Sequence, residues 1–142
     1  MTSERQATTL ATSTERLAAL RGNCMGAGVL VIIQFGLGAG VNLYVALPRH
    51  RSFFSTVFGS AALAAHAVVA LALLAAGIAA LIRAARARRA IVPTSAGLAA
   101  IVVAGAGGAS FVGSGSDGAS LVMALAAGAA MFCYLAAVFS LR

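Results

Sequence analysis

Four long stretches of this sequence carry no Asp, Glu, Lys or Arg, and they cover most of the chain: residues 22–48, 52–82, 90–116 and 118–141. A helix needs roughly 20 mostly apolar residues to cross a bilayer, so each stretch is long enough. A transmembrane barrel would alternate apolar and polar residues, whereas these stretches are apolar on every face. The sequence therefore predicts an all-α fold, a four-helix transmembrane bundle in up-down-up-down order, with spans at about 24–46, 57–82, 93–113 and 119–140.

The composition agrees with a lipid environment. Hydrophobic residues make up 61% of the chain and charged residues 9%, whereas soluble domains average about 25% charged residues. A chain with so few charges cannot cover a water-facing surface, so the lipid bilayer is the first partner it predicts. Residues 1–16 are polar and predict a cytoplasmic tail, with helix from about Leu17, and residues 17–142 form the membrane domain.

The arginines predict the orientation. The chain has a formal net charge of +7, and its basic residues are all Arg. Four spans place eight arginines on one side: Arg5, Arg16, Arg21, Arg83, Arg86, Arg88, Arg89 and Arg142. Only Arg49 and Arg51 fall on the other side. Because Lys and Arg concentrate in cytoplasmic segments, both termini are expected in the cytoplasm.

The same arginines lie between apolar runs, which favours contact with lipid phosphates and argues against nucleic acid as a partner. Arginine without lysine, together with many Ala and Gly residues, is typical of bacteria with GC-rich genomes. The expected location is therefore the bacterial cytoplasmic membrane, which the chain would cross several times.

Small residues at a spacing of four predict where the helices pack. Gly22 and Gly26, and again Gly36 and Gly40, have the spacing that lets two helices approach closely in lipid. Such close packing indicates contact within the bundle, with a second copy of the chain, or with a larger membrane complex.

One imidazole, His66, lies inside the second span, in the run AALAAHAVVALALLAAGIAALI. On the first span, Gln34 and Asn42 share a face with small residues, because side chains four apart stack on one side of a helix. Counting residues from the predicted span ends puts Gln34, His66 and Met131 at one depth, with Tyr134 one turn from Met131. The sequence thus predicts a buried polar cluster of Gln34, Asn42, His66 and Tyr134.

An ionisable group within a span suggests a function, and three roles for His66 stay open. It can be a neutral imidazole hydrogen-bonded to Gln34 that ties two helices together. It can be an axial ligand of haem b, with Met131 as the second ligand, in a haem- or quinone-associated electron-transfer protein. The third role is proton exchange in a small transporter, but Glu4, Glu15 and Asp117 all fall outside the spans. The other histidine, His50, is expected at the outer surface.

Other chemistry finds little support in the sequence. Cys24 and Cys133 lie in different spans without metal-ligand spacing, so no metal site is expected. The sequence has no catalytic serine motif, no paired carboxylates and no phosphate-binding loop. No cofactor is expected, with haem b as the open alternative, and an enzyme is the less favoured class.

Two segments, QFGLGAGVNLYVALP (34–48) and AAHAVVALALL (64–74), resemble a group of small four-span actinobacterial membrane proteins. The shared pattern is a Gln in the first span, an Asn-Leu-Tyr-Val stretch before a Pro, and one His early in the second span. The resemblance covers about half of the chain. It implies a four-helix architecture and a joint role for Gln34, Asn42, Pro48 and His66, and it carries no activity.

Together these observations predict an integral membrane protein that acts without catalysis, as a packing or accessory subunit. The alternatives are electron transfer through His66 and, less favoured, proton-coupled transport.

Overall fold

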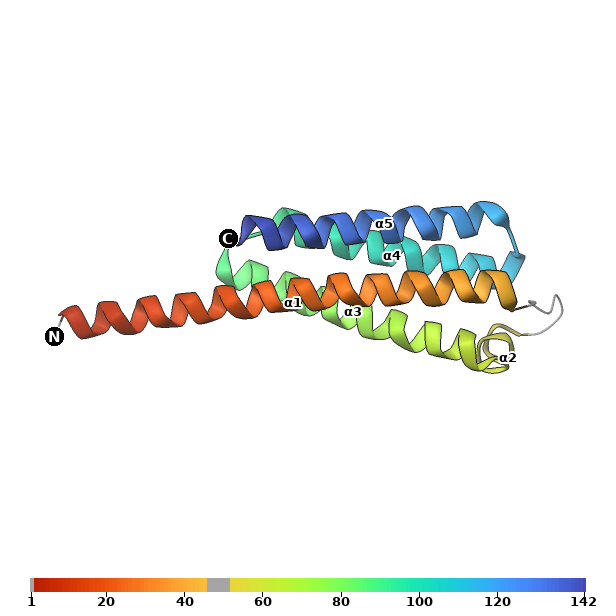
Figure 1. Ribbon diagram of the computed structural model, residues 1–142, viewed down its shortest axis with the longest axis horizontal. Helices are drawn as coiled ribbons and strands as arrows, with labels where there is room; N and C mark the ends of the chain where they lie inside the picture. The colour runs from red at the N-terminus through yellow and green to blue at the C-terminus, as the bar shows by residue number, and fades with distance from the viewer. Residues whose placement is uncertain (1, 46–51) are drawn as a thin grey trace.

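The computed structural model describes the backbone of residues 2–45 and 52–142, and the side chains from Ser13 onward within those ranges. It is built from five helices in the described residues: α1 (Thr2–Tyr44), α2 (Phe53–Phe58), α3 (Ala61–Ala87), α4 (Ile91–Ser114) and α5 (Asp117–Ser140) (Figure 1). The expectations for Pro48, Arg49, His50 and Arg51 lie outside the described residues.

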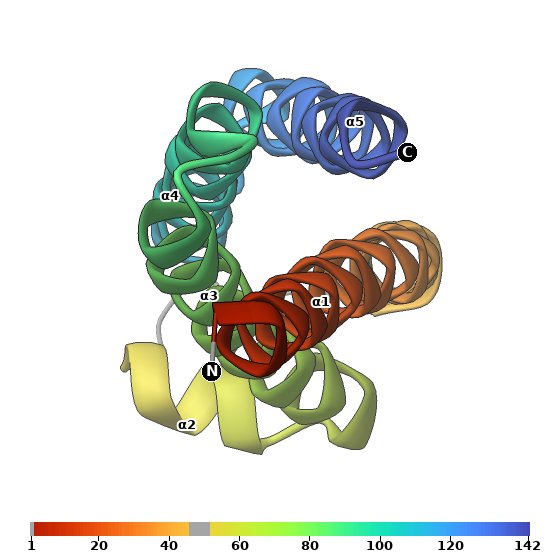
Figure 2. The same cartoon turned by 90° about the vertical axis from the view of Figure 1, so that its left-hand side faces the viewer.

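Four of these helices, α1, α3, α4 and α5, are long and apolar enough to cross a membrane. They run up-down-up-down, which brings the N- and C-termini to the same end of the bundle (Figure 1). Seen along the bundle, they follow one another in chain order, and the last packs back against the first (Figure 2). The predicted fold is confirmed: the chain is a four-helix bundle of a multi-pass membrane protein.

Helix α1 begins much earlier than the expected start at about Leu17. It is continuous from Thr2 to Tyr44, and its first part projects beyond the other three long helices (Figure 1). The reason is local: residues 2–21 contain neither Gly nor Pro, and they include good helix formers such as Ala, Leu, Glu, Gln and Arg.

The second span begins later than predicted, at Ala61 instead of about residue 57. The short helix α2 ends at Phe58, and Gly59 makes a sharp corner before Ser60, whose backbone is extended. A Cβ at position 59 would lie 2.6 Å from the Ser55 carbonyl oxygen, so the corner requires glycine. As a result, His66 lies in the second turn of α3 and not deep within a span.

The two remaining connections between long helices are short. Arg88 and Ala90 adopt left-handed backbone conformations between α3 and α4, with φ angles of 51° and 54°. Gly115 (φ 65°) ends α4 by donating its N–H to the Phe111 carbonyl at 2.7 Å, the usual use of a left-handed residue after a helix. Both turns force neighbouring helices to lie antiparallel and close together.

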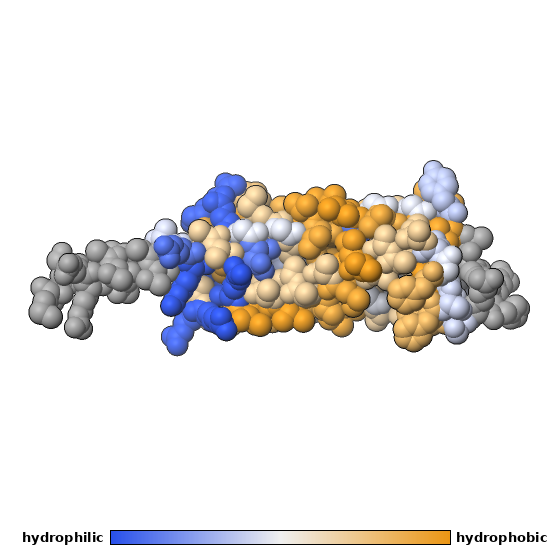
Figure 3. Space-filling view, turned by 90° about the horizontal axis from the view of Figure 1, so that it is seen from below, coloured by the Kyte–Doolittle hydropathy of each residue, from blue (hydrophilic) through white to orange (hydrophobic). Residues whose placement is uncertain are grey.

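We call one end of the bundle the arginine-rich end, because it carries Arg16, Arg21, Arg83, Arg86, Arg88, Arg89 and Arg142. The opposite end carries α2 and is called the α2 end. On the face shown in Figure 3, hydrophilic residues gather at the arginine-rich end and apolar residues cover the middle. This distribution matches a bilayer core between two interfaces.

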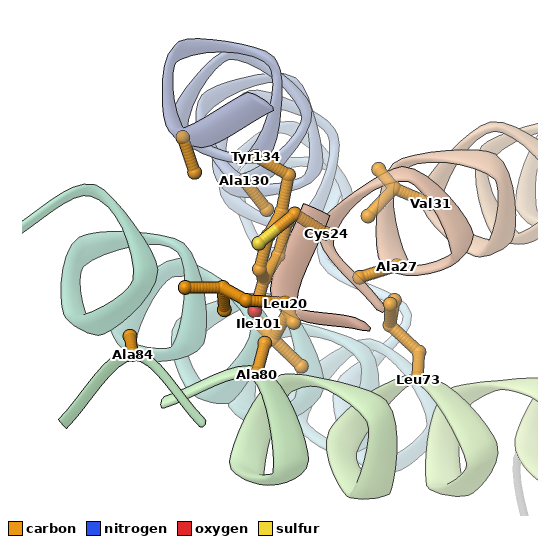
Figure 4. Close-up of a cluster of buried hydrophobic side chains, with 11 residues drawn as sticks. Leu20, Cys24, Ala27, Val31, Leu73, Ala80, Ala84, Ile101, Ala130 and Tyr134 are labelled. Atoms are coloured by element: carbon orange, nitrogen blue, oxygen red, sulfur yellow. The ribbon is translucent and has the colours of Figure 1, made fainter. Parts of the chain in front are cut away.

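The buried hydrophobic side chains of the described residues form two clusters. The larger lies where all four long helices meet, and Figure 4 shows it around Tyr134; its buried members are Leu20, Cys24, Ala27, Val31, Leu73, Ala80, Ala84, Ile101, Ala130, Tyr134 and Ala137. The smaller cluster contains Val41, Val57 and Leu63 at the α2 end. The bundle is therefore packed most fully toward its arginine-rich end.

Candidate functional site

The structure brings Gln34 of α1 and His66 of α3 together. The Gln34 side-chain nitrogen lies 3.1 Å from His66 Nε2, across the interface between the two helices. Both residues are half-buried. Two helices that are antiparallel neighbours thus meet here through a pair of polar side chains.

Gly38 makes room for the imidazole. It is buried one helical turn after Gln34, and a Cβ built there would lie 3.0 Å from His66 Cε1. A side chain at position 38 would push the ring away from α1 and lengthen the contact with Gln34. The Gln-x-x-x-Gly spacing of α1 therefore provides both the hydrogen-bond partner and the space for His66.

Two buried polar atoms of this pair, His66 Nδ1 and Gln34 Oε1, find no hydrogen-bond partner in the part of the chain that the structure describes. When Gln34 donates, His66 Nε2 must be unprotonated, so the neutral imidazole carries its proton on Nδ1. The Nδ1–H donor and the Oε1 acceptor then both lack a protein partner within the described residues. Such an arrangement can tie two helices together. It also leaves one hydrogen-bond donor and one acceptor near the α2 end for a further partner.

Tyr134 lies elsewhere, in the large cluster nearer the arginine-rich end. It is fully buried, and its ring passes between α5, α3 and α4 (Figure 4). A Cβ at Gly77 would lie 2.8 Å from the Tyr134 hydroxyl oxygen, and one at Gly97 would lie 3.0 Å from the ring. Since α3 rises about 16 Å between His66 and Gly77, Tyr134 is not part of the Gln34–His66 site.

The other two expected members of the site are also separate. Asn42 is exposed near the end of α1. Met131 packs against the large cluster around Tyr134. It lies one turn from that tyrosine and is therefore nearer the arginine-rich end than His66. The depth comparison made from the sequence was right for Gln34 and His66, which are in contact. It was wrong for Met131 and Tyr134, in part because it counted from residue 57 whereas α3 begins only at Ala61.

This geometry does not fit the alternative in which His66 and Met131 are the two haem ligands. Met131 and His66 belong to different depths of the bundle, Nε2 of His66 already faces Gln34, and Nδ1 is buried. His66 and Met131 therefore do not fit haem b as its axial ligands. Among the described residues, no group of three or more His, Cys, Asp or Glu side chains is placed to hold a metal ion.

Two further contacts between α1 and α3 were not anticipated from the sequence. The Asn23 amide donates to the Ala76 carbonyl at 3.1 Å, and the Arg83 guanidinium donates to the Ala19 carbonyl at 3.3 Å. The signal was present in the sequence: Asn23 is a polar residue just inside an uncharged stretch, and Arg83 directly follows the second one. Their partners are backbone carbonyls, which no residue pattern reveals.

Comparison with known proteins identifies no relative from which a function of this site could be inferred. No protein-family model matches the chain, and neither the curated proteins nor the solved structures contain a similar protein.

Proposed function

We propose that this protein is a non-enzymatic packing subunit of the bacterial cytoplasmic membrane, with both termini in the cytoplasm, and that it associates through α1 with a second copy of itself. The observation that carries the proposal is an open face of α1. Cβ atoms built at Gly36 and Gly40 would meet no atom of a neighbouring helix within 4 Å.

An open face of glycines is a poor surface to leave against lipid. Glycine within a helix costs about 1 kcal/mol relative to alanine, and without a side chain it makes few contacts with acyl chains. The cost is offset when another helix packs against the exposed backbone, because close approach strengthens van der Waals contact. Gly36 and Gly40 lie far from the arginine-rich end and face an open surface, so they favour a partner helix.

The neighbouring residues support the same use. Ile33 lies on the face of Gly36 and Gly40, at helical spacings of three and seven, and it is exposed. In a parallel pair of copies related by a two-fold axis, each residue of this face meets its own counterpart or a near neighbour. The arrangement fits a self-association through the half of α1 nearer the α2 end.

Cysteine cross-linking in native membranes tests the proposal. The background is the chain carrying Cys24→Ala and Cys133→Ala, so that the only thiol is the one introduced. Ile33→Cys is expected to form a covalent dimer on oxidation. Val68→Cys is the matched control, because Val68 is also exposed to lipid and lies at nearly the same depth, two residues after His66.

Gly36→Leu combined with Gly40→Leu is expected to abolish the Ile33→Cys dimer without unfolding the chain, because both positions are open. Equal cross-linking of Ile33→Cys and Val68→Cys would contradict the proposal, since it would reflect random collision. A single-copy particle on a native gel, with no cross-link, would contradict it as well. Cross-linking of Ile33→Cys to a different protein would contradict self-association, and it would mean that this face of α1 contacts another subunit of a larger complex.

A further inference from the structure

An open groove runs between α1 and α3 at the arginine-rich end. It is a wide-open depression with a volume of about 690 Å³, lined by small and apolar residues together with two polar side chains, Asn23 and Arg83. Gly22 and Gly26 form part of its wall, and no atom lies within 4 Å of a Cβ built at either glycine. The groove is therefore shallow, unfilled by the protein's own side chains, and continuous from a charged residue into the apolar part of the bundle.

Arg83 stands at the outer end of this groove. Its Nη1 donates to the Ala19 carbonyl at 3.3 Å, so the guanidinium reaches from α3 across to α1. A guanidinium has five N–H donors, and this contact uses one of them. The others can bind phosphate oxygens in the paired geometry that favours arginine over lysine.

Asn23 lies one helical turn deeper than Ala19, about 6 Å along α1. One N–H of its amide donates to the Ala76 carbonyl at 3.1 Å. The second N–H is available to an acceptor in the groove, and the ester carbonyls of a glycerophospholipid lie below its phosphate. Beyond Asn23 the wall is apolar and ends near Leu30, which suits an acyl chain.

We propose that this groove binds one anionic glycerophospholipid, with the phosphate on Arg83, an ester carbonyl on Asn23 and an acyl chain over Gly22 and Gly26. Charge complementarity favours this occupant over a partner helix, because Arg83 stands at the mouth and further arginines surround it at the same end. Basic pockets between transmembrane helices are typical sites for anionic headgroups. The inference uses a different part of α1 from the proposed self-association and does not rest on it.

Native mass spectrometry of the purified full chain, titrated with phosphatidylglycerol or phosphatidylcholine, tests the proposal. One phosphatidylglycerol is expected to bind in preference to phosphatidylcholine. Arg83→Gln is expected to weaken binding on the order of tenfold, the effect of losing one charge-assisted contact. Arg86→Gln is the matched control, since it removes the same charge from the same helix outside the groove, and it is expected to leave binding nearly unchanged.

A second pair of variants tests the groove without altering charge. Gly22→Leu with Gly26→Leu fills the groove and is expected to weaken binding like Arg83→Gln, whereas Gly128→Leu, at an open glycine on α5, is expected to have no effect. Equal losses of lipid affinity in Arg83→Gln and Arg86→Gln would overturn the proposal, because they would show that the lipid is attracted by the overall surface charge and not by the groove. Unchanged binding in the glycine pair, equal binding of phosphatidylcholine, or displacement of the lipid by inorganic phosphate would also overturn it.

Discussion

The two halves of the bundle are held together in different ways. Toward the arginine-rich end, all four long helices meet around Tyr134, and the cluster there is closed by small residues such as Cys24, Ala80 and Ala137. Toward the α2 end, the buried hydrophobic cluster of the described residues contains Val41, Val57 and Leu63. The seam between α1 and α3 there contains the Gln34–His66 contact.

The difference teaches where stability and adaptability reside in the molecule. Dense packing of small side chains against a large aromatic ring leaves little freedom to rearrange. A single polar contact with two unpartnered atoms constrains its helices less, because interhelical hydrogen bonds in membranes average about 0.6 kcal/mol. We therefore expect substitutions around Tyr134 to affect folding, and substitutions at His66 to affect it far less.

The largest effect is expected from Tyr134→Ala. Removing a buried aromatic ring from a packed core typically costs about 3–5 kcal/mol, because the surrounding helices close the cavity only in part. Tyr134→Phe is the control: the hydroxyl has no hydrogen-bond partner among the described residues, so its loss is expected to be neutral or slightly stabilising. Unfolding by SDS in mixed micelles measures both. A costly Tyr134→Phe would show that the hydroxyl has a partner, such as a bound water.

A smaller loss, about 2 kcal/mol, is expected from Gly97→Leu, since inserting side-chain atoms into a packed core usually costs about 1–3 kcal/mol. A Cβ at this position already comes within 3.0 Å of the Tyr134 ring. Gly105→Leu is the matched control on the same helix, because the space around Gly105 is open. The same unfolding assay compares the two. Equal losses would mean that α4 is sensitive to bulk along its whole length, and the contrast between the halves would then fail.

The sequence predicted the four-helix architecture well. That architecture depends on the length and the hydropathy of each apolar stretch, and both can be read directly from the sequence. The contact between Gln34 and His66 could also be predicted, since two polar groups in apolar helices favour each other as partners. The depth of Tyr134 and Met131 relative to His66 could not be predicted, because it depends on where α3 begins. That start is set by the corner at Gly59, where a Cβ would collide with the Ser55 carbonyl. A four-residue error in the start of α3 displaces the depth expected for His66 by about 6 Å relative to α5, which is more than one turn.

The smallest effect in this comparison is the coupling between Gln34 and His66. A double-mutant cycle with Gln34→Leu, His66→Leu and the combined variant is expected to give a coupling free energy of about 0.6 kcal/mol. Each single change leaves the other polar group buried without its partner, whereas the combined change leaves an apolar seam, so the double variant should be more stable than the single losses would suggest. The measurement is again unfolding in mixed micelles, with the exposed Val68→Ala on the same helix as the control. A coupling of several kcal/mol would contradict a weak contact, and it would mean that the α2 end is held as rigidly as the cluster around Tyr134. A coupling near zero would mean that close packing at Gly38 and the neighbouring apolar contacts hold α1 against α3 at the α2 end. The polar pair would then serve a purpose other than stability.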